Sequence, residues 1–273
     1  MSNLLKAGFF RLRKSSIYWM FVILTIVIAI FNLIKFNNTE FQTTLIKVLN
    51  DYIIYIGIFI AIFISIFVGK EYSDGIIRNK IIVGHSRISI YLSKLLLSII
   101  ASIFCELIYV FTVYLIGIHI YKSTQLSISQ ILLCILNSFL VIVEYCSIFN
   151  FITMNSSEIT FSTVASIIIF IAICVIEQYF GYIANSQKFI NNTFIDENGN
   201  EQIISQEPNP NYPGDSKVKI AKIVYYSIPL GQANKISNLD FESLNILPIF
   251  SISAIFLLNL LGIFLFLKKE IKQ

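Results

Sequence analysis

The chain has 273 residues, of which 56% are hydrophobic and only 13% are charged, and its net charge is +4. The charged share is about half of that in a soluble domain. A water-soluble core of this size could not bury so much apolar surface, which excludes a soluble globular protein and makes lipid the solvent.

Each crossing of a bilayer needs about 20 mostly apolar residues, because the hydrocarbon core is ~30 Å thick. The sequence contains six such runs: Tyr18–Ile34, Tyr52–Val68, Ile90–Ile120, Ile131–Ile152, Ile159–Phe180 and Leu247–Leu267. Lipid offers the backbone no hydrogen-bond partners, so a span is a helix or part of a closed barrel. The runs show no alternation with a period of two. We therefore predict an all-α polytopic membrane protein with residues 1–273 in a single transmembrane domain.

The N-terminal region, residues 1–16, combines an apolar face with basic residues, which predicts a helix lying in the cytoplasmic headgroup region. Its apolar face and its charges are Leu4, Leu5, Phe9, Leu12 and Lys6, Arg11, Arg13, Lys14. The alternative is a plain basic flank of the first span. A cleaved signal peptide is disfavoured, because the apolar run is long and no cleavage site of the A-x-A type follows it.

Basic residues in short loops indicate the orientation. They gather before the first span, after the second span and after the last one. The sequence thus predicts both termini in the cytoplasm and residues 181–246 outside the cell. The five prolines all lie late in the chain, and the stretch Glu207–Gly214 is typical of an extended, turn-rich connection. Pro248 suits the first turn of the sixth span.

The connection after the second span, residues 69–89, is polar at both ends and amphipathic in the middle. Ser73 or Asp74 can cap a short helix, and Gly84 can end it in the left-handed conformation. Ile77 and Ile81 lie four residues apart on one face. A helix this short is unstable alone and needs a partner surface. The alternative is an ordinary basic cytoplasmic loop.

This connection resembles the first cytoplasmic loop of ABC-2-type transporter permeases. The resemblance lies in residues 69–72 (Gly-Lys-Glu-Tyr), 75–80 (Gly-Ile-Ile-Arg-Asn-Lys) and 84–87 (Gly-His-Ser-Arg), followed by Tyr91 and Lys94. The family's loop reads E-Y-x-x-G-T-I-R near its start, and this chain has Ile76 where threonine is usual. The six-span layout, the basic N-terminal helix and the Pro229-Leu-Gly motif extend the likeness loosely over the whole chain.

The resemblance implies a bacterial plasma-membrane exporter whose loop docks as a coupling helix onto a separate cytoplasmic ATP-binding subunit. The implied coupling residues are Glu71, Tyr72, Gly75, Ile77, Arg78, Lys80, Ile81 and Arg87. The chain has no G-x-x-x-x-G-K-[ST] phosphate loop, so ATP and Mg²⁺ are expected in the partner subunit and not in this chain. A second permease subunit, identical or different, and membrane lipid are the other implied partners. Within the family, the chain is most similar to small Gram-positive export permeases for toxin, lantibiotic or bacitracin-like peptides, which favours amphipathic peptide cargo.

Glu106, Glu144 and Glu177 fall inside predicted spans, where a charge costs at least ~2.5–3.5 kcal/mol. Glu106 and Glu144 are candidates for a polar lining that binds cationic cargo. They could equally hold helices together through hydrogen bonds. Glu177 lies near an external helix end, where it can reach water.

Other functions remain open at this stage. A multidrug or lipid-linked substrate exporter of the same family is one alternative, and a sensor or immunity protein without transport is another. A proton-coupled transporter using Glu106 and Glu144 is disfavoured by the lack of internal repeats. An intramembrane hydrolase is disfavoured because the two histidines, His85 and His119, are expected on opposite sides. The four cysteines lack metal or disulfide spacing and are expected to pack in the spans. We expect no catalytic residue, no metal and no nucleic-acid partner.

Overall fold

A computed structural model describes residues 1–37, 44–121, 126–156, 158–195 and 201–270. Six of its helices are long and apolar enough to cross a membrane. They are α2 (Ser16–Asn37), α3 (Leu45–Ser73), α5 (Arg87–Gly117), α6 (Ile128–Asn155), α7 (Ile159–Ala184) and α11 (Leu247–Lys268). Each coincides with one of the six predicted runs. The prediction of an all-α, multi-pass membrane protein is confirmed.

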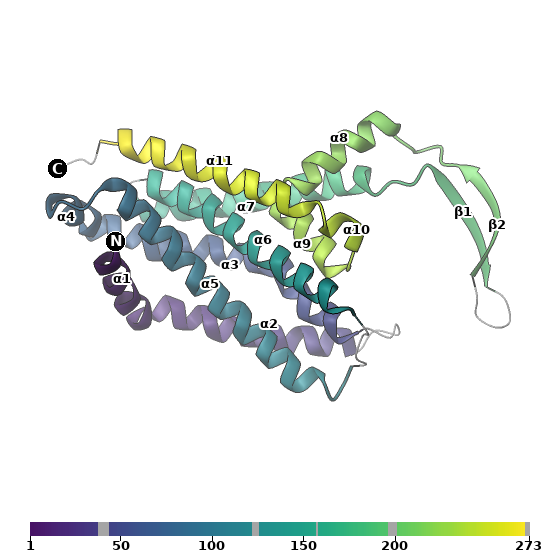
Figure 1. Ribbon diagram of the computed structural model, residues 1–273, viewed down its shortest axis with the longest axis horizontal. Coiled ribbons are helices and arrows are strands. Elements are labelled where there is room, and N and C mark those ends of the chain that lie inside the picture. Colours follow the sequence, from purple (N-terminus) through teal and green to yellow (C-terminus); the bar gives the residue numbers. More distant parts are fainter. Residues whose placement is uncertain (38–43, 122–125, 157, 196–200, 271–273) are drawn as a thin grey trace.

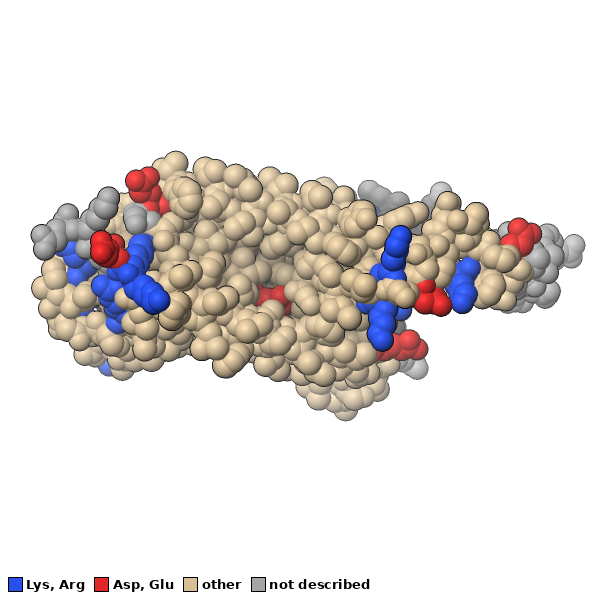
Figure 2. All heavy atoms as spheres, turned by 90° about the horizontal axis from the view of Figure 1, so that it is seen from above, with Lys and Arg blue, Asp and Glu red and all other residues tan. Residues whose placement is uncertain are grey.

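The long helices run side by side along the long axis of the molecule (Figure 1). The N-terminal helix α1 (Ser2–Lys14), the short helix α4 (Ile76–Ile82) and the C-terminal end of α11 meet at one end, which we name the α4 end. At the other end, the hairpin end, lie β1 (Phe189–Ile195), β2 (Glu201–Pro208) and α8 (Asp215–Tyr226). Figure 2 shows Lys, Arg, Asp and Glu gathered toward the two ends of the visible face, with one acidic group in the apolar middle. This charge distribution suits a protein whose middle lies in lipid.

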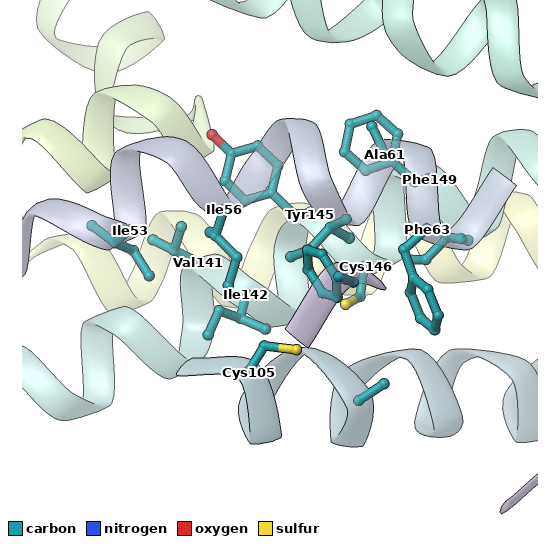
Figure 3. Packing of buried hydrophobic residues seen from close by; sticks show 14 of the residues in the cluster. Ile53, Ile56, Ala61, Phe63, Cys105, Val141, Ile142, Tyr145, Cys146 and Phe149 are labelled. Atoms are coloured by element: carbon teal, nitrogen blue, oxygen red, sulfur yellow. The ribbon is translucent and has the colours of Figure 1, made fainter. Parts of the chain in front are cut away.

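The core of the bundle is built around α3. Two-thirds of its most apolar window (67%) is buried inside the chain, compared with 17% for α7 and for α11. Figure 3 shows Ile53 and Ile56 of α3 beside Val141 and Ile142 of α6, with Cys105 of α5 near Ile142. At Gly57 the backbone approaches Tyr145 so closely that a Cβ atom would lie 2.6 Å from its Cζ. The remaining spans surround α3 and leave apolar faces outward, as a lipid-exposed bundle requires.

The cysteines follow the expected pattern of packing residues. Cys105, Cys134 and Cys146 are buried, Cys174 is half-buried, and all four are free thiols. Within the described ranges, no group of three or more His, Cys, Asp or Glu side chains is placed to hold a metal ion.

Residues 181–246 are more structured than an extended external segment. β1 and β2 pair as an antiparallel hairpin, a two-stranded sheet that the prediction of an all-α fold did not include. The proline-rich stretch does turn, with the amide of Tyr212 donating to the carbonyl of Asn209. After α8 come α9 (Pro229–Ser237) and α10 (Phe241–Leu244).

Helix α9 is buried in the bundle and not in an external loop. Pro229 begins it, as proline prefers the first turn, and Leu230, Ala233 and Ile236 are buried. It packs against α3, α6 and α7. At Gly231 a Cβ atom would lie 2.2 Å from the carbonyl oxygen of Tyr225, so glycine permits this close return of the chain. Part of the segment 181–246, which the sequence predicts to lie outside the cell, therefore packs between the spanning helices.

Candidate functional site

The connection between α3 and α5 forms the predicted short helix, α4. The N-cap of α4 is Gly75, which has a φ of 65°. The expectation that the side chain of Ser73 or Asp74 caps the helix is therefore wrong. Gly84 has a φ of 93°, which confirms the predicted left-handed stop. Ser86 then caps α5 by accepting a hydrogen bond of 3.2 Å from the amide of Ser89. Two glycines with positive φ thus set the position of α4, because other residues reach this conformation at a cost.

Glu71, in the last turn of α3, lies completely buried among three basic side chains, which together we name the Glu71 cluster. Lys80 of α4 donates to its Oε2 at 2.6 Å, and Lys94 of α5 and Arg11 of α1 contact its Oε1. A carboxylate is unfavourable at the negative end of a helix dipole, so these cations offset both that penalty and the cost of burial. The cluster joins α1, α3, α4 and α5 at one buried point.

The outward surface of α4 differs from the expected one. Ile77 is only 1% exposed and packs into the core, and Ile81 is half-buried against it. The prediction that Ile77 and Ile81 face a partner is therefore wrong, because the chain itself covers this side of the helix. The apolar side chains that reach outward are Ile82 and Val83, which are 70% and 77% exposed. Arg78 is exposed beside them.

The side chains of Tyr72 and Arg87 bond to backbone carbonyls at the C-terminal ends of other helices and do not face a docking partner. The Tyr72 hydroxyl donates to the carbonyl of Met154 at the end of α6, at 2.5 Å. Nη1 of Arg87 lies 2.7–3.1 Å from the carbonyl oxygens of Phe266, Leu267 and Lys269 at the end of α11. A guanidinium on the last carbonyls of a helix satisfies orphan acceptors and complements the helix dipole.

Lys269, just after α11, repeats this arrangement on α6. Its Nζ donates to the carbonyls of Met154 at 3.2 Å and Ser156 at 2.7 Å, and it lies 4.2 Å from the centre of the Tyr72 ring. Burial lowers the pKa of Lys269 to about 8. The cluster and these two helix ends give the α4 end a compact set of basic side chains that hold the spans together.

Glu106, on α5, lines a cavity of about 370 Å³ between α3, α5 and α6. Most of the lining is apolar, from residues such as Ile53, Leu107 and Ile135. No hydrogen bond or ion pair holds the Glu106 carboxyl within the described part of the chain. Of the two acids expected to line a cargo path, Glu106 is the one whose side chain borders this cavity.

Glu144 is placed differently. It is 1% exposed and does not line this cavity. Nε2 of Gln232, on the entering helix α9, donates to its Oε2 at 3.0 Å, and the Ser251 hydroxyl of α11 donates to Oε1 of Gln232 at 2.7 Å. Such a chain of hydrogen bonds in a lipid-facing protein holds helices together. Glu177, expected to reach water, likewise accepts a bond of 2.7 Å from Asn234 of α9.

The sequence analysis named Arg11 and Lys94 but did not pair them with Glu71, because they are far from it along the chain. It did not single out Gln232 or Lys269, which lie in a connection and in the C-terminal tail. The usable signal was Glu71 itself, an acid at the end of an apolar span with basic segments on the same side. It predicts a cationic environment but not which cations provide it.

Comparison with known proteins adds no assignment. No family model matches the chain, and no curated protein matches it. The function is therefore argued from the geometry of the α4 end and the cavity.

Proposed function

We propose that this chain is the membrane-spanning permease subunit of an ATP-driven exporter and that α4 receives the force from a separate cytoplasmic ATP-binding subunit. The observation that carries the proposal is the Glu71 cluster. It fastens a short helix with an exposed apolar tip to the most buried span of the bundle.

A short helix such as α4 can transmit a movement to the spans only if it is firmly attached to them. Lys80 on α4 and Glu71 on α3 are directly bonded, and Ile77 is embedded in the core. Pulling α4 outward would separate a buried ion pair and expose an apolar side chain, and losing one partner of such a pair costs ~3–5 kcal/mol. A displacement of α4 is therefore passed to α3 and α5 more readily than it is absorbed in the connection.

The docking surface on this proposal is Ile82 and Val83, with Arg78 at its rim. The partner would offer an apolar groove with acidic or carbonyl groups at the edge, opposite the exposed guanidinium of Arg78. ATP and Mg²⁺ act in that partner. The cargo class we favour is an amphipathic or hydrophobic peptide, moved by two permease subunits together across a bacterial plasma membrane.

A photo-crosslinking amino acid at Val83 tests the proposal in intact cells. We expect a crosslink to a protein that contains a nucleotide-binding phosphate loop. Ile82→Asp should weaken co-purification of that protein, because anchors of this kind typically contribute ~1–4 kcal/mol. Ile128→Asp is the matched control, because Ile128 is 78% exposed but begins α6 at the hairpin end.

Crosslinking to lipid alone would mean that α4 is a membrane-surface helix and would overturn the proposal. Unchanged co-purification with Ile82→Asp would show that the partner binds elsewhere. Ile77→Asp is not a suitable probe, because it would place a charge in the core and unfold the region.

A further inference from the structure

The Glu106 cavity lies in the half of the bundle nearer the hairpin end. Ile46 and Leu49 line it from the start of α3, and Ile131 lines it from the start of α6, both at that end (Figure 1). Leu107 and Ile135, both on its lining, are 59% and 60% exposed on the outer surface of the bundle. The cavity is therefore open sideways, where a membrane protein meets lipid chains.

Among the described residues that line the cavity, the polar side chains are Asn50, Tyr52, Glu106, Cys134 and Ser138. None of these lining residues is Lys, Arg or His, and Glu106 is the only acid among them. The other polar groups of the cavity are partly occupied, since the Asn50 amide donates to the carbonyl of Ile236 and the Tyr52 hydroxyl is bonded to Thr25. A carboxylate at this depth is costly without a cation, and the described chain supplies none.

The size of the cavity limits what fits. One turn of an α-helix with its side chains is ~10 Å wide and ~5.4 Å long, or roughly 400 Å³. The cavity volume of about 370 Å³ thus favours a small molecule over a helical peptide or a span of a second copy. It lies at the small end of the range for small-molecule sites.

We propose that the cavity between α3, α5 and α6 binds a small cationic amphiphile, whose apolar body lies against Ile53 and Ile135 and whose ammonium or guanidinium group pairs with Glu106. The ligand enters from the lipid through the side formed by Leu107 and Ile135. Treating this ligand as a second exported cargo, in addition to a peptide, rests on the proposed function, whereas the binding itself does not.

The test uses the purified full-length chain in phosphatidylcholine nanodiscs, without any ATPase. A nitroxide-labelled alkylammonium is added, and its immobilised fraction is measured by electron paramagnetic resonance. The matched neutral probe is the alkyl alcohol with the same label. We expect saturable immobilisation of the ammonium, with Glu106→Gln weakening it about tenfold, in the range of a charge-assisted hydrogen bond.

Two further variants make the result specific. Glu177→Gln removes another acid of the spans, one that already bonds Asn234, and should leave binding unchanged. Ile135→Trp adds bulk at an exposed lining position, so it should reduce binding of both probes without disturbing the core.

Equal binding of the alcohol and the ammonium, or wild-type binding in Glu106→Gln, would overturn the proposal. Displacement of the ammonium by added phosphatidylethanolamine, whose headgroup carries its own ammonium, would also overturn it, by assigning the cavity to lipid. Failure here would leave the crosslink at Val83 intact, and failure of that crosslink would leave the binding intact, so the two proposals are tested separately.

Discussion

Glu71 shows how one residue decides the geometry of the α4 end. A carboxylate with no exposed surface is held by Lys80, Lys94 and Arg11, and Lys94 is itself fully buried. Neither buried partner is stable without the other, because an uncompensated charge away from water is costly. The sequence pattern marks Glu71 as unusual, but the pairing depends on α1 folding back beside α5, which no local signal encodes.

We predict that Glu71→Gln lowers the free energy of unfolding by ~3–5 kcal/mol, because it leaves three cations close together without their anion. Thermal unfolding of the protein in nanodiscs measures the loss. Glu242→Gln removes an exposed acid and should have little effect. The double variant Glu71→Gln/Lys94→Met should lose less than the sum of its single variants, and strict additivity would contradict a direct pair.

At the scale of elements, the spans could be predicted and their connections only in part. Apolar runs of sufficient length locate the six spans, because lipid imposes the length directly. The largest difference is at α3, which begins at Leu45 and not at Tyr52. Helix α4 and its stop at Gly84 were also predictable from glycine and polarity. Its buried side was not, since the spacing of Ile77 and Ile81 gives a face without saying what covers it. The entry of α9 was missed because its polar residues, such as Gln232 and Asn234, resemble those of a surface loop and find their partners only in the fold.

Gly75 offers a test of how α4 is positioned. Its φ is 65°, and a Cβ atom there would meet nothing within 4 Å. Gly75→Ala should therefore cost only the backbone penalty, ~1–2 kcal/mol, and Gly75→Asn less, since asparagine tolerates this conformation. Thermal unfolding of both variants and of the wild type is the measurement. Equal stability of the alanine variant would mean that the turn relaxes to another conformation and that α4 is not fixed by it.

At the scale of the whole molecule, the chain places both termini and α4 at one end and the hairpin at the other. The structure does not say on which side of the membrane each end lies, and from the basic residues we predict that the α4 end lies in the cytoplasm. We predict that Ser86→Cys reacts with an impermeant thiol reagent only after permeabilisation, whereas Gln187→Cys reacts in intact cells. The background lacks the four native cysteines. Reversed labelling would invert the topology and move the proposed docking helix outside.

The hydrogen bonds from Lys269 to the carbonyls at the end of α6 have a consequence for biosynthesis. The carbonyl of Ser156 is bonded by Lys269, which is synthesised 113 residues later. Arg87 is bonded to the carbonyl of Lys269, 182 residues further along the chain. Until the last span is inserted, the first five spans lack these hydrogen bonds at the α4 end. A nascent chain stalled before residue 269 therefore differs chemically from a finished one at that surface, because the carbonyls of Met154 and Ser156 lack this donor.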